Sequence, residues 1–113
     1  MDSIVRESLL YDFYGAMLTD KKRQVMELYH EDDMSLAEIA GEMGISRAAV
    51  YDSLKSAERQ LEKYEENLGL VARFEKNEKL AEKAKEIIKK AALDESEAKA
   101  LCNIIEELSS AES

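Results

Sequence analysis

The sequence predicts an all-α fold, and three observations carry this prediction. The chain of 113 residues contains no proline and only four glycines, the two residue types that most often interrupt helices. Alanine, leucine, glutamate and lysine dominate, and these residues lose little conformational freedom on entering a helix. Apolar residues recur every three to four positions through most of the chain. We therefore predict a helix-turn-helix core of three or four helices, followed by a carboxyl-terminal helical arm.

The first two helices are predicted from a stripe and a cap. A first helix runs from Ser3 to about Met17, and Gly15 weakens its last turn. Its apolar stripe comprises Val5, Leu9, Leu10, Phe13, Tyr14 and Met17. Thr19 provides an N-cap hydroxyl for a second helix that ends near Glu31. The residues predicted to face inward on it are Val25, Met26, Leu28 and Tyr29.

The third and fourth helices follow an acidic connector. Ser35 and Glu38 have the spacing of a capping box, so a third helix begins there, and Gly44 ends it after about two turns. Ser46 caps a long fourth helix that stops near Gly69. The predicted apolar seam of this helix comprises Val50, Leu54, Ala57, Leu61, Tyr64 and Leu68.

Residues 70–113 have a different composition, rich in lysine, alanine and glutamate. We predict that residues 1–69 form the helix-turn-helix domain and that residues 70–113 form an arm with two helices, the second capped by Asp94. The first arm helix carries a seam of Leu70, Phe74, Asn77, Ala81, Ala84, Ile88 and Ala91, and the second directs Ala98, Leu101, Cys102, Ile105 and Leu108 inward. The last residues, "SSAES", are expected to fray.

The apolar seams exceed what a four-helix core uses, which predicts a homodimer. We expect this dimer to form through the first helix and the long carboxyl-terminal helices, so that the arm of residues 70–113 takes part in it. The residues predicted to form it are Phe13, Tyr14, Leu61, Tyr64, Phe74, Asn77 and Ile88. Asn77 at a seam position suits a polar contact that sets the register of two helices. A slightly rotated helix with Asn77 in water is an equally good alternative.

Ser35–Leu54 carries the spacing of a helix-turn-helix. Ala40 is small enough for the closest approach of two crossing helices, and Gly44 tolerates the positive φ of the turn. Ile45, Val50 and Leu54 fill the angle between the helices. Exclusion from that seam turns Arg47, Ala48, Tyr51, Asp52 and Lys55 outward.

Such an outward face suits nucleic acid. Arg47 is suited to form two hydrogen bonds with a guanine edge, and Tyr51 to stack on a base or contact a thymine methyl group. Ser46 and the first backbone amides of the helix are suited to bind a phosphate. The predicted nucleic-acid-binding residues are Ser46, Arg47, Ala48, Tyr51, Lys55 and Arg59, with Lys21, Lys22 and Arg23 as backbone clamps. The alternative is a solvated charged face, or for Tyr51 a dimer contact.

The charge of the chain opposes general binding to phosphates. Twenty-five acidic residues stand against 16 lysines and arginines, giving a formal net charge of −9. Binding to nucleic acid regardless of sequence depends on clustered cations. The charge therefore favours either a protein that binds a specific nucleic-acid sequence or one with a different function. One such function is that of an acidic adaptor, which would dock a basic protein through Glu31, Asp32 and Asp33. The simpler interpretation of these three acids is a solvent-exposed loop without a partner.

Leu9–Glu65 resembles the YlxM family of small bacterial helix-turn-helix proteins. The resemblance rests on "DFYGAMLTDKKRQVMELY", "SLAEIA" and "ISRAAVYDSLKSAERQLEKYE", which occur in the family's order and spacing. The same core is similar to region four of bacterial sigma factors, where the positions matching Ser46, Arg47, Ala48, Tyr51 and Lys55 lie on the contact face. The YlxM resemblance implies a regulatory or accessory role near the signal recognition particle, with its RNA or its GTPase as partner. The sigma resemblance implies a DNA-binding transcriptional regulator. The arm after Leu70 departs from the sigma core.

Nothing in the sequence indicates an enzyme, a cofactor or a metal site. His30 is the only histidine and has no second histidine or cysteine at metal-ligand spacing. The carboxylates fall on exposed helix faces, and a glycine-rich phosphate loop is missing. The lone Cys102 reads as a buried small hydrophobe and suits a reducing compartment. Without a signal peptide or membrane span in the sequence, we expect a cytoplasmic protein.

Overall fold

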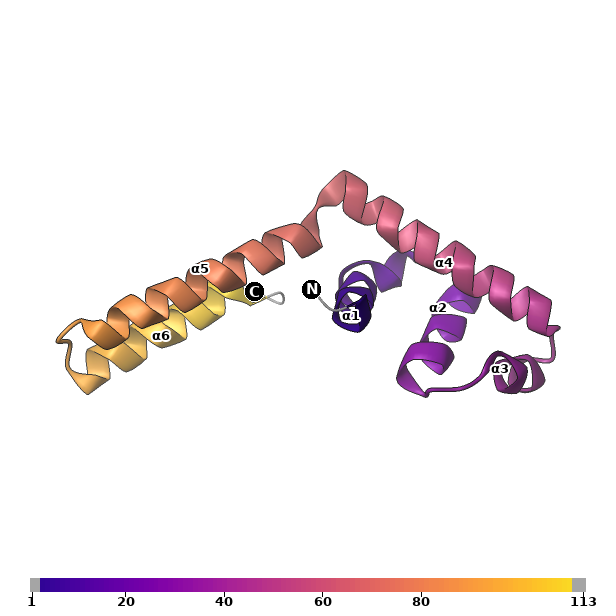
Figure 1. The fold of residues 1–113 in the computed structure, drawn as a ribbon, viewed down its shortest axis with the longest axis horizontal. Helices are drawn as coiled ribbons and strands as arrows, with labels where there is room; N and C mark the ends of the chain where they lie inside the picture. Colours follow the sequence, from indigo (N-terminus) through magenta and orange to yellow (C-terminus); the bar gives the residue numbers. More distant parts are fainter. Residues whose placement is uncertain (1–2, 111–113) are drawn as a thin grey trace. The chain divides into compact units, whose positions relative to one another are not determined.

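The computed structural model of this protein describes residues 3–110, and within them it contains helices and turns but no strand. The predicted all-α fold is therefore confirmed (Figure 1). In chain order the elements are α1 (Ser3–Tyr14), the 3-10 turn η1 (Gly15–Met17), α2 (Asp20–Met26), the π-helical segment η2 (Glu27–Glu31), α3 (Leu36–Met43), α4 (Arg47–Leu68), α5 (Leu70–Lys90) and α6 (Glu95–Ser109). They form two compact units, Met1–Gly69 and Leu70–Ser113.

The side chains predicted as caps form the expected hydrogen bonds. The Oγ of Ser35 accepts from the backbone N–H of Glu38 at 3.1 Å, and the Glu38 carboxylate accepts from the N–H of Ser35 at 3.1 Å. This completes the predicted capping box of α3. The side chains of Thr19, Ser46 and Asp94 each accept a hydrogen bond from the backbone N–H three residues on, at the starts of α2, α4 and α6.

Two glycines end helices by adopting a left-handed backbone. Gly44 follows α3 with φ of 67°, and Gly69 follows α4 with φ of 66°. This region carries little steric cost for glycine because it has no Cβ atom. Both helix ends were predicted at these residues.

The first helix ends earlier than predicted, at Tyr14, and continues as the turn η1. Gly15 is buried there, and a Cβ atom at this position would lie 2.9 Å from the ring of Tyr11. A 3-10 turn has three residues per turn and so shifts the phase of the stripe. Leu18 is consequently buried, whereas Met17, which was predicted to face inward, is 47% exposed.

The core of the first unit lies where α1, α2, α3 and α4 meet. Its buried apolar residues are Leu10, Tyr14, Leu18, Val25, Met26, Ile39, Ala40, Val50, Leu54, Ala57 and Leu61. The predicted seam of α4 is thus confirmed from Val50 to Leu61, while Leu68 at its end is exposed. Val5 and Tyr29 are also exposed, contrary to the prediction.

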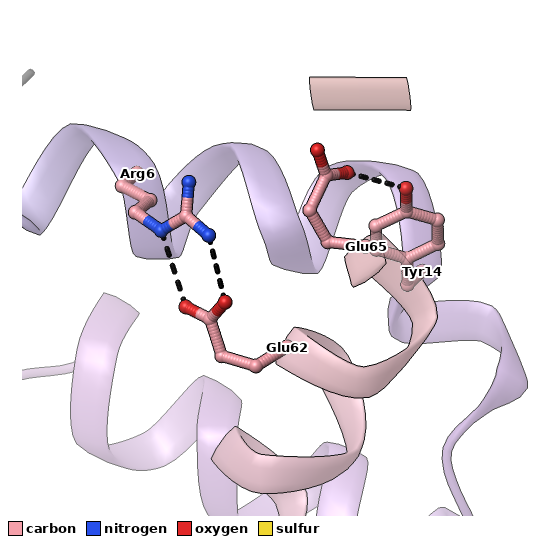
Figure 2. Close-up of polar contacts among 4 residues, drawn as sticks. All are labelled: Arg6, Tyr14, Glu62 and Glu65. Carbon is pink, nitrogen blue, oxygen red and sulfur yellow. Dashed lines mark hydrogen bonds and ion pairs between the residues drawn. The ribbon is translucent and has the colours of Figure 1, made fainter. Parts of the chain in front are cut away.

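Polar contacts join α1 to α4 beside this core (Figure 2). The hydroxyl of the fully buried Tyr14 donates to Oε1 of Glu65 at 2.6 Å. Nε and Nη2 of Arg6 donate to the two carboxylate oxygens of Glu62 at 3.1 and 2.7 Å. The geometry is bidentate, but a partly exposed pair of this kind adds only about 0–1 kcal/mol to stability.

The second unit is a pair of helices, α5 and α6, packed side by side (Figure 1). Ala81 is buried on its seam, and an ion pair between Lys85 and Glu106 links the two helices. Five residues of α6 were predicted to face inward. Ala98, Cys102 and Ile105 are half-buried, whereas Leu101 and Leu108 are exposed, contrary to the prediction. Of the tail predicted to fray, Ser109 is the last residue of α6 and residues 111–113 lie outside the described range.

Within residues 3–110, none of the helices combines the length and the apolar character that crossing a bilayer requires.

Candidate nucleic-acid interface

A tight turn connects α3 to α4 in the arrangement of a helix-turn-helix. The carbonyl oxygen of Ala40 accepts hydrogen bonds from the N–H groups of Gly44 and Ile45, the latter at 3.1 Å. Ala40 itself is buried, as expected for the small residue where two helices approach closely. α4 then begins at Arg47, directly after the cap residue Ser46.

The amino-terminal half of α4 separates a buried side from an open side. Val50 is fully buried and Leu54 is 4% exposed, so this side packs into the core. The opposite side is exposed and carries Arg47, Ala48, Tyr51, Asp52 and Lys55, and the exposed Arg59 follows just beyond this half. All the α4 residues predicted to contact nucleic acid are therefore accessible within this chain.

The cap residue Ser46 is exposed but already engaged. Its Oγ accepts from the backbone N–H of Ala49 at 3.0 Å. This bond satisfies one of the amides that the start of a helix leaves open and holds the first turn of α4 in place. Ser46 therefore caps the helix whose first residue is Arg47.

Lys55 is held on the exposed face by two neighbours on α4. Its Nζ lies 3.4 Å from Oε1 of Glu58 and 5.7 Å from the centroid of the Tyr51 ring. The carboxylate of Glu58 raises the pKa of Lys55 above its ordinary value. Lys55 is thus fully charged at neutral pH, but a phosphate has to compete with Glu58 for it.

The three predicted backbone clamps at the start of α2 differ in what they contact. Lys21 is exposed to solvent. The ammonium group of Lys22 donates to Oε1 of Gln60 on α4 at 3.1 Å, and Arg23 forms an ion pair with Asp20. Lys22 and Arg23 are half-buried, so only Lys21 presents an unengaged cation in this first turn among the described contacts.

Two of the residues predicted to form a dimer interface belong to the core. Tyr14 is fully buried and Leu61 is 1% exposed. The prediction that they are surplus apolar surface is wrong, because α1 and α4 enclose them within one chain. The other predicted dimer residues, Phe13, Tyr64, Phe74, Asn77 and Ile88, are half-buried.

Sequence reasoning missed a cluster of titratable side chains in the first unit. Glu7 of α1, His30 of η2 and Glu58 of α4 bring their ligand atoms within 4.8 Å of one another. Their positions in the chain follow no metal-binding spacing, since each comes from a different helix. Only the packing of the three helices could have revealed the cluster.

Comparison with known proteins supports the helix-turn-helix assignment. Residues 1–103 match the model of the UPF0122 family, described as "Putative helix-turn-helix protein, YlxM / p13 like". A UPF0122 protein of Halalkalibacterium halodurans is 47% identical over 95 residues, which are 84% of this chain and 87% of that protein. Relatives from Caldanaerobacter subterraneus and Geobacillus kaustophilus are 53% identical over 87 residues and 42% identical over 108 residues. These cover 77% and 96% of this chain, and 74% and 98% of the respective relatives. The chain therefore belongs to the UPF0122 family of YlxM-like helix-turn-helix proteins, as its sequence motifs predicted.

Proposed function

We propose that this protein is a non-enzymatic regulator that binds duplex DNA through the amino-terminal half of α4. One observation supports this proposal above the others. The second helix of a helix-turn-helix packs Val50 and Leu54 inward and leaves Arg47, Tyr51 and Lys55 open. In proteins that use this motif to bind DNA, the start of the second helix enters the major groove.

The chemistry of the exposed side chains suits some of them to contact bases and others to contact phosphates. Arg47 can form two hydrogen bonds with the O6 and N7 atoms of a guanine, and Tyr51 can contact a thymine methyl group. Lys55, one turn further on, and Lys21 on α2 suit the phosphate backbone. Each of these side chains lies on the open side of its helix.

The acidic character of the chain limits which kind of binding is expected. With a net charge of −9, the protein lacks the cationic surface that attracts nucleic acid regardless of sequence. Asp52 is exposed on the same side of α4 and repels phosphates. We therefore expect binding that depends strongly on base sequence and involves few phosphate contacts.

Duplex DNA is favoured over structured RNA by the shape of the reading element. A helix enters the major groove of B-form DNA, but the major groove of an RNA helix is too deep and narrow for it. The RNA of the signal recognition particle, which the YlxM resemblance implies as a ligand, would have to be bound at a loop or across its shallow groove. The same residues serve either ligand, so one titration distinguishes them.

The test is a fluorescence-anisotropy titration of the full chain against a duplex DNA selected from a random library and the particle's RNA, at several salt concentrations. For the unaltered protein, the dependence of affinity on salt concentration should correspond to only a few phosphate contacts. Replacing Arg47 and Lys55 together with alanine should abolish binding. Lys79→Ala with Lys83→Ala removes two exposed cations from α5 and should leave binding unchanged. Equal loss in both double variants would indicate a general charge effect and contradict the proposed face. Binding of the RNA but not of DNA would retain the face and change its ligand.

A second candidate function follows from the exposed acids after η2. Glu31, Asp32 and Asp33 are all exposed, and Asp33 has a positive φ of 56° that ends the helical segment in a tight turn. Such an acidic corner suits a basic protein surface, for which the GTPase of the signal recognition particle is the candidate partner. Pull-down of that GTPase that survives ribonuclease and is lost in a Glu31→Gln, Asp32→Asn, Asp33→Asn variant would favour this function. Capture that ribonuclease abolishes would favour nucleic acid.

A further inference from the structure

We propose that Glu7, His30 and Glu58 form a site for a divalent transition metal, with Zn²⁺ as its preferred ion. The three side chains come from α1, η2 and α4, and their ligand atoms all lie within 4.8 Å of one another. The site adjoins the exposed face of α4 that is proposed to bind DNA, because Oε1 of Glu58 lies 3.4 Å from Nζ of Lys55. Its chemistry follows from the distances and the surroundings of the three groups.

The separation of the ligand atoms matches a shared ion better than a direct hydrogen bond. Nδ1 of His30 and Oε2 of Glu7 are 3.4 Å apart, which is longer than the usual 2.7–3.2 Å of an N–H···O bond. Zinc binds nitrogen and oxygen ligands at about 2.0–2.2 Å, so two ligands of one tetrahedral ion lie about 3.4 Å apart. The other ligand pairs lie within 4.8 Å of one another.

The two carboxylates are also unfavourably placed in the absence of a cation. Glu7 and Glu58 are both half-buried, and their carboxylates lie close together. Oε1 of Glu58 is shielded from solvent and accepts no hydrogen bond from the described residues. Its nearest cation is the Lys55 ammonium at 3.4 Å, on a side chain that is 46% exposed. A divalent ion between the carboxylates would relieve their repulsion and displace this flexible lysine.

The site has a route to solvent and an open coordination position. Glu7 and His30 both line a surface pocket of about 130 Å³, with Tyr11 and Met26 among its other walls. Three protein ligands leave a fourth tetrahedral position for water. One nitrogen and two carboxylate oxygens suit zinc, whereas magnesium prefers oxygen ligands in octahedral geometry.

His30 gives the test a direct signal, because it is the only histidine of the chain. Zinc chloride added to the full, tag-free protein should shift the single set of imidazole ¹⁵N signals, with the largest change at Nδ1. Magnesium chloride at the same concentration should leave these signals unchanged. Saturation with zinc should raise Tm by about 5–10 °C, because the ion joins three helices of one unit in the folded state only.

Calorimetric titration of variants assigns the ligands. His30→Gln, Glu7→Gln and Glu58→Gln should each weaken zinc binding more than about tenfold, with the fold checked by circular dichroism. Glu31→Gln removes an exposed acid from the same pocket, and Cys102→Ser removes the lone thiol of the second unit; both should bind zinc as the unaltered protein does. Zinc binding that survives His30→Gln, unchanged imidazole signals in the unaltered protein, or equal weakening by Glu31→Gln would overturn the proposal.

Discussion

The two compact units of this chain are both helical but enclose very different amounts of apolar surface. In the first unit the side chains of Val25, Ile39 and Val50 are fully buried, and each of α1, α2, α3 and α4 contributes buried residues. In the second unit α5 contributes Val71 and Ala81, and α6 has no buried residue in its described length.

This difference teaches what helical periodicity does and does not predict. Both units show apolar residues at four- and three-residue steps, and both fold into helices. This spacing of apolar residues predicts only which residues lie on the same face of a helix. Whether that face is enclosed depends on how many helices surround it. Two helices cover one side of each other, so Leu101 and Leu108 are exposed in the second unit.

The largest expected difference between the two units is the loss of stability when a leucine side chain is truncated. Leu61→Ala should lower the free energy of unfolding by about 2–5 kcal/mol, because it leaves a cavity among α1, α2 and α4. Leu108→Ala, at a position that is 74% exposed on α6, should change it by less than about 0.5 kcal/mol. Urea denaturation followed by circular dichroism measures both. Similar losses at the two positions would mean that α6 is covered by a partner in solution.

A second contrast lies within the first unit, between two glycines. Gly15→Ala should destabilise the protein by about 1–3 kcal/mol, because the new Cβ would meet the Tyr11 ring at 2.9 Å. Gly41→Ala should stabilise it by about 0.5–1 kcal/mol, because this glycine lies inside α3 with nothing within 4 Å of a new Cβ. Thermal denaturation of the two variants should shift Tm in opposite directions. A shift in the same direction would contradict this account of η1.

A third, smaller effect concerns the start of α4. Ser46→Ala should cost about 1 kcal/mol, because the N–H of Ala49 loses its acceptor. Ser46→Asn should restore most of this stability, since asparagine is an equally good cap. Chemical denaturation gives the stability, and the same two variants in the DNA titration test whether the cap also positions Arg47. If asparagine failed to restore stability, the serine hydroxyl would have another role.

The smallest effect is a pH dependence at the cap of α6. Backbone hydrogen bonding, chiefly from Glu97, lowers the pKa of Asp94 below its ordinary value. The cap therefore contributes its full stabilisation above the ordinary pKa, about 4, and loses it as pH falls through the lower pKa of the folded state. NMR titration of the Glu97 amide should report this loss. Asp94→Asn should keep the cap and remove the pH dependence; an amide that titrates unchanged in that variant would exclude Asp94 as the cause.

The helix-turn-helix was predicted well because its determinants are local. Gly44 and Ser46 set the turn, and the spacing of Val50 and Leu54 sets which side of α4 is buried; the exposed residues follow by exclusion. The partners of the individual cations were not predictable in this way. Gln60, which accepts from Lys22, is 38 residues away in sequence and meets it only because α2 packs on α4.

By itself, the sequence determined the starts of α2, α3, α4 and α6 and the ends of α3 and α4, because an N-cap bond or a left-handed glycine acts within about four residues. It also determined the family and the open side of α4. The tertiary structure decided that Tyr14 and Leu61 are enclosed, that Gly15 is pressed against Tyr11, and that two glutamates and a histidine converge. These contacts join residues from different helices, and their geometry depends on packing between elements that no local spacing records.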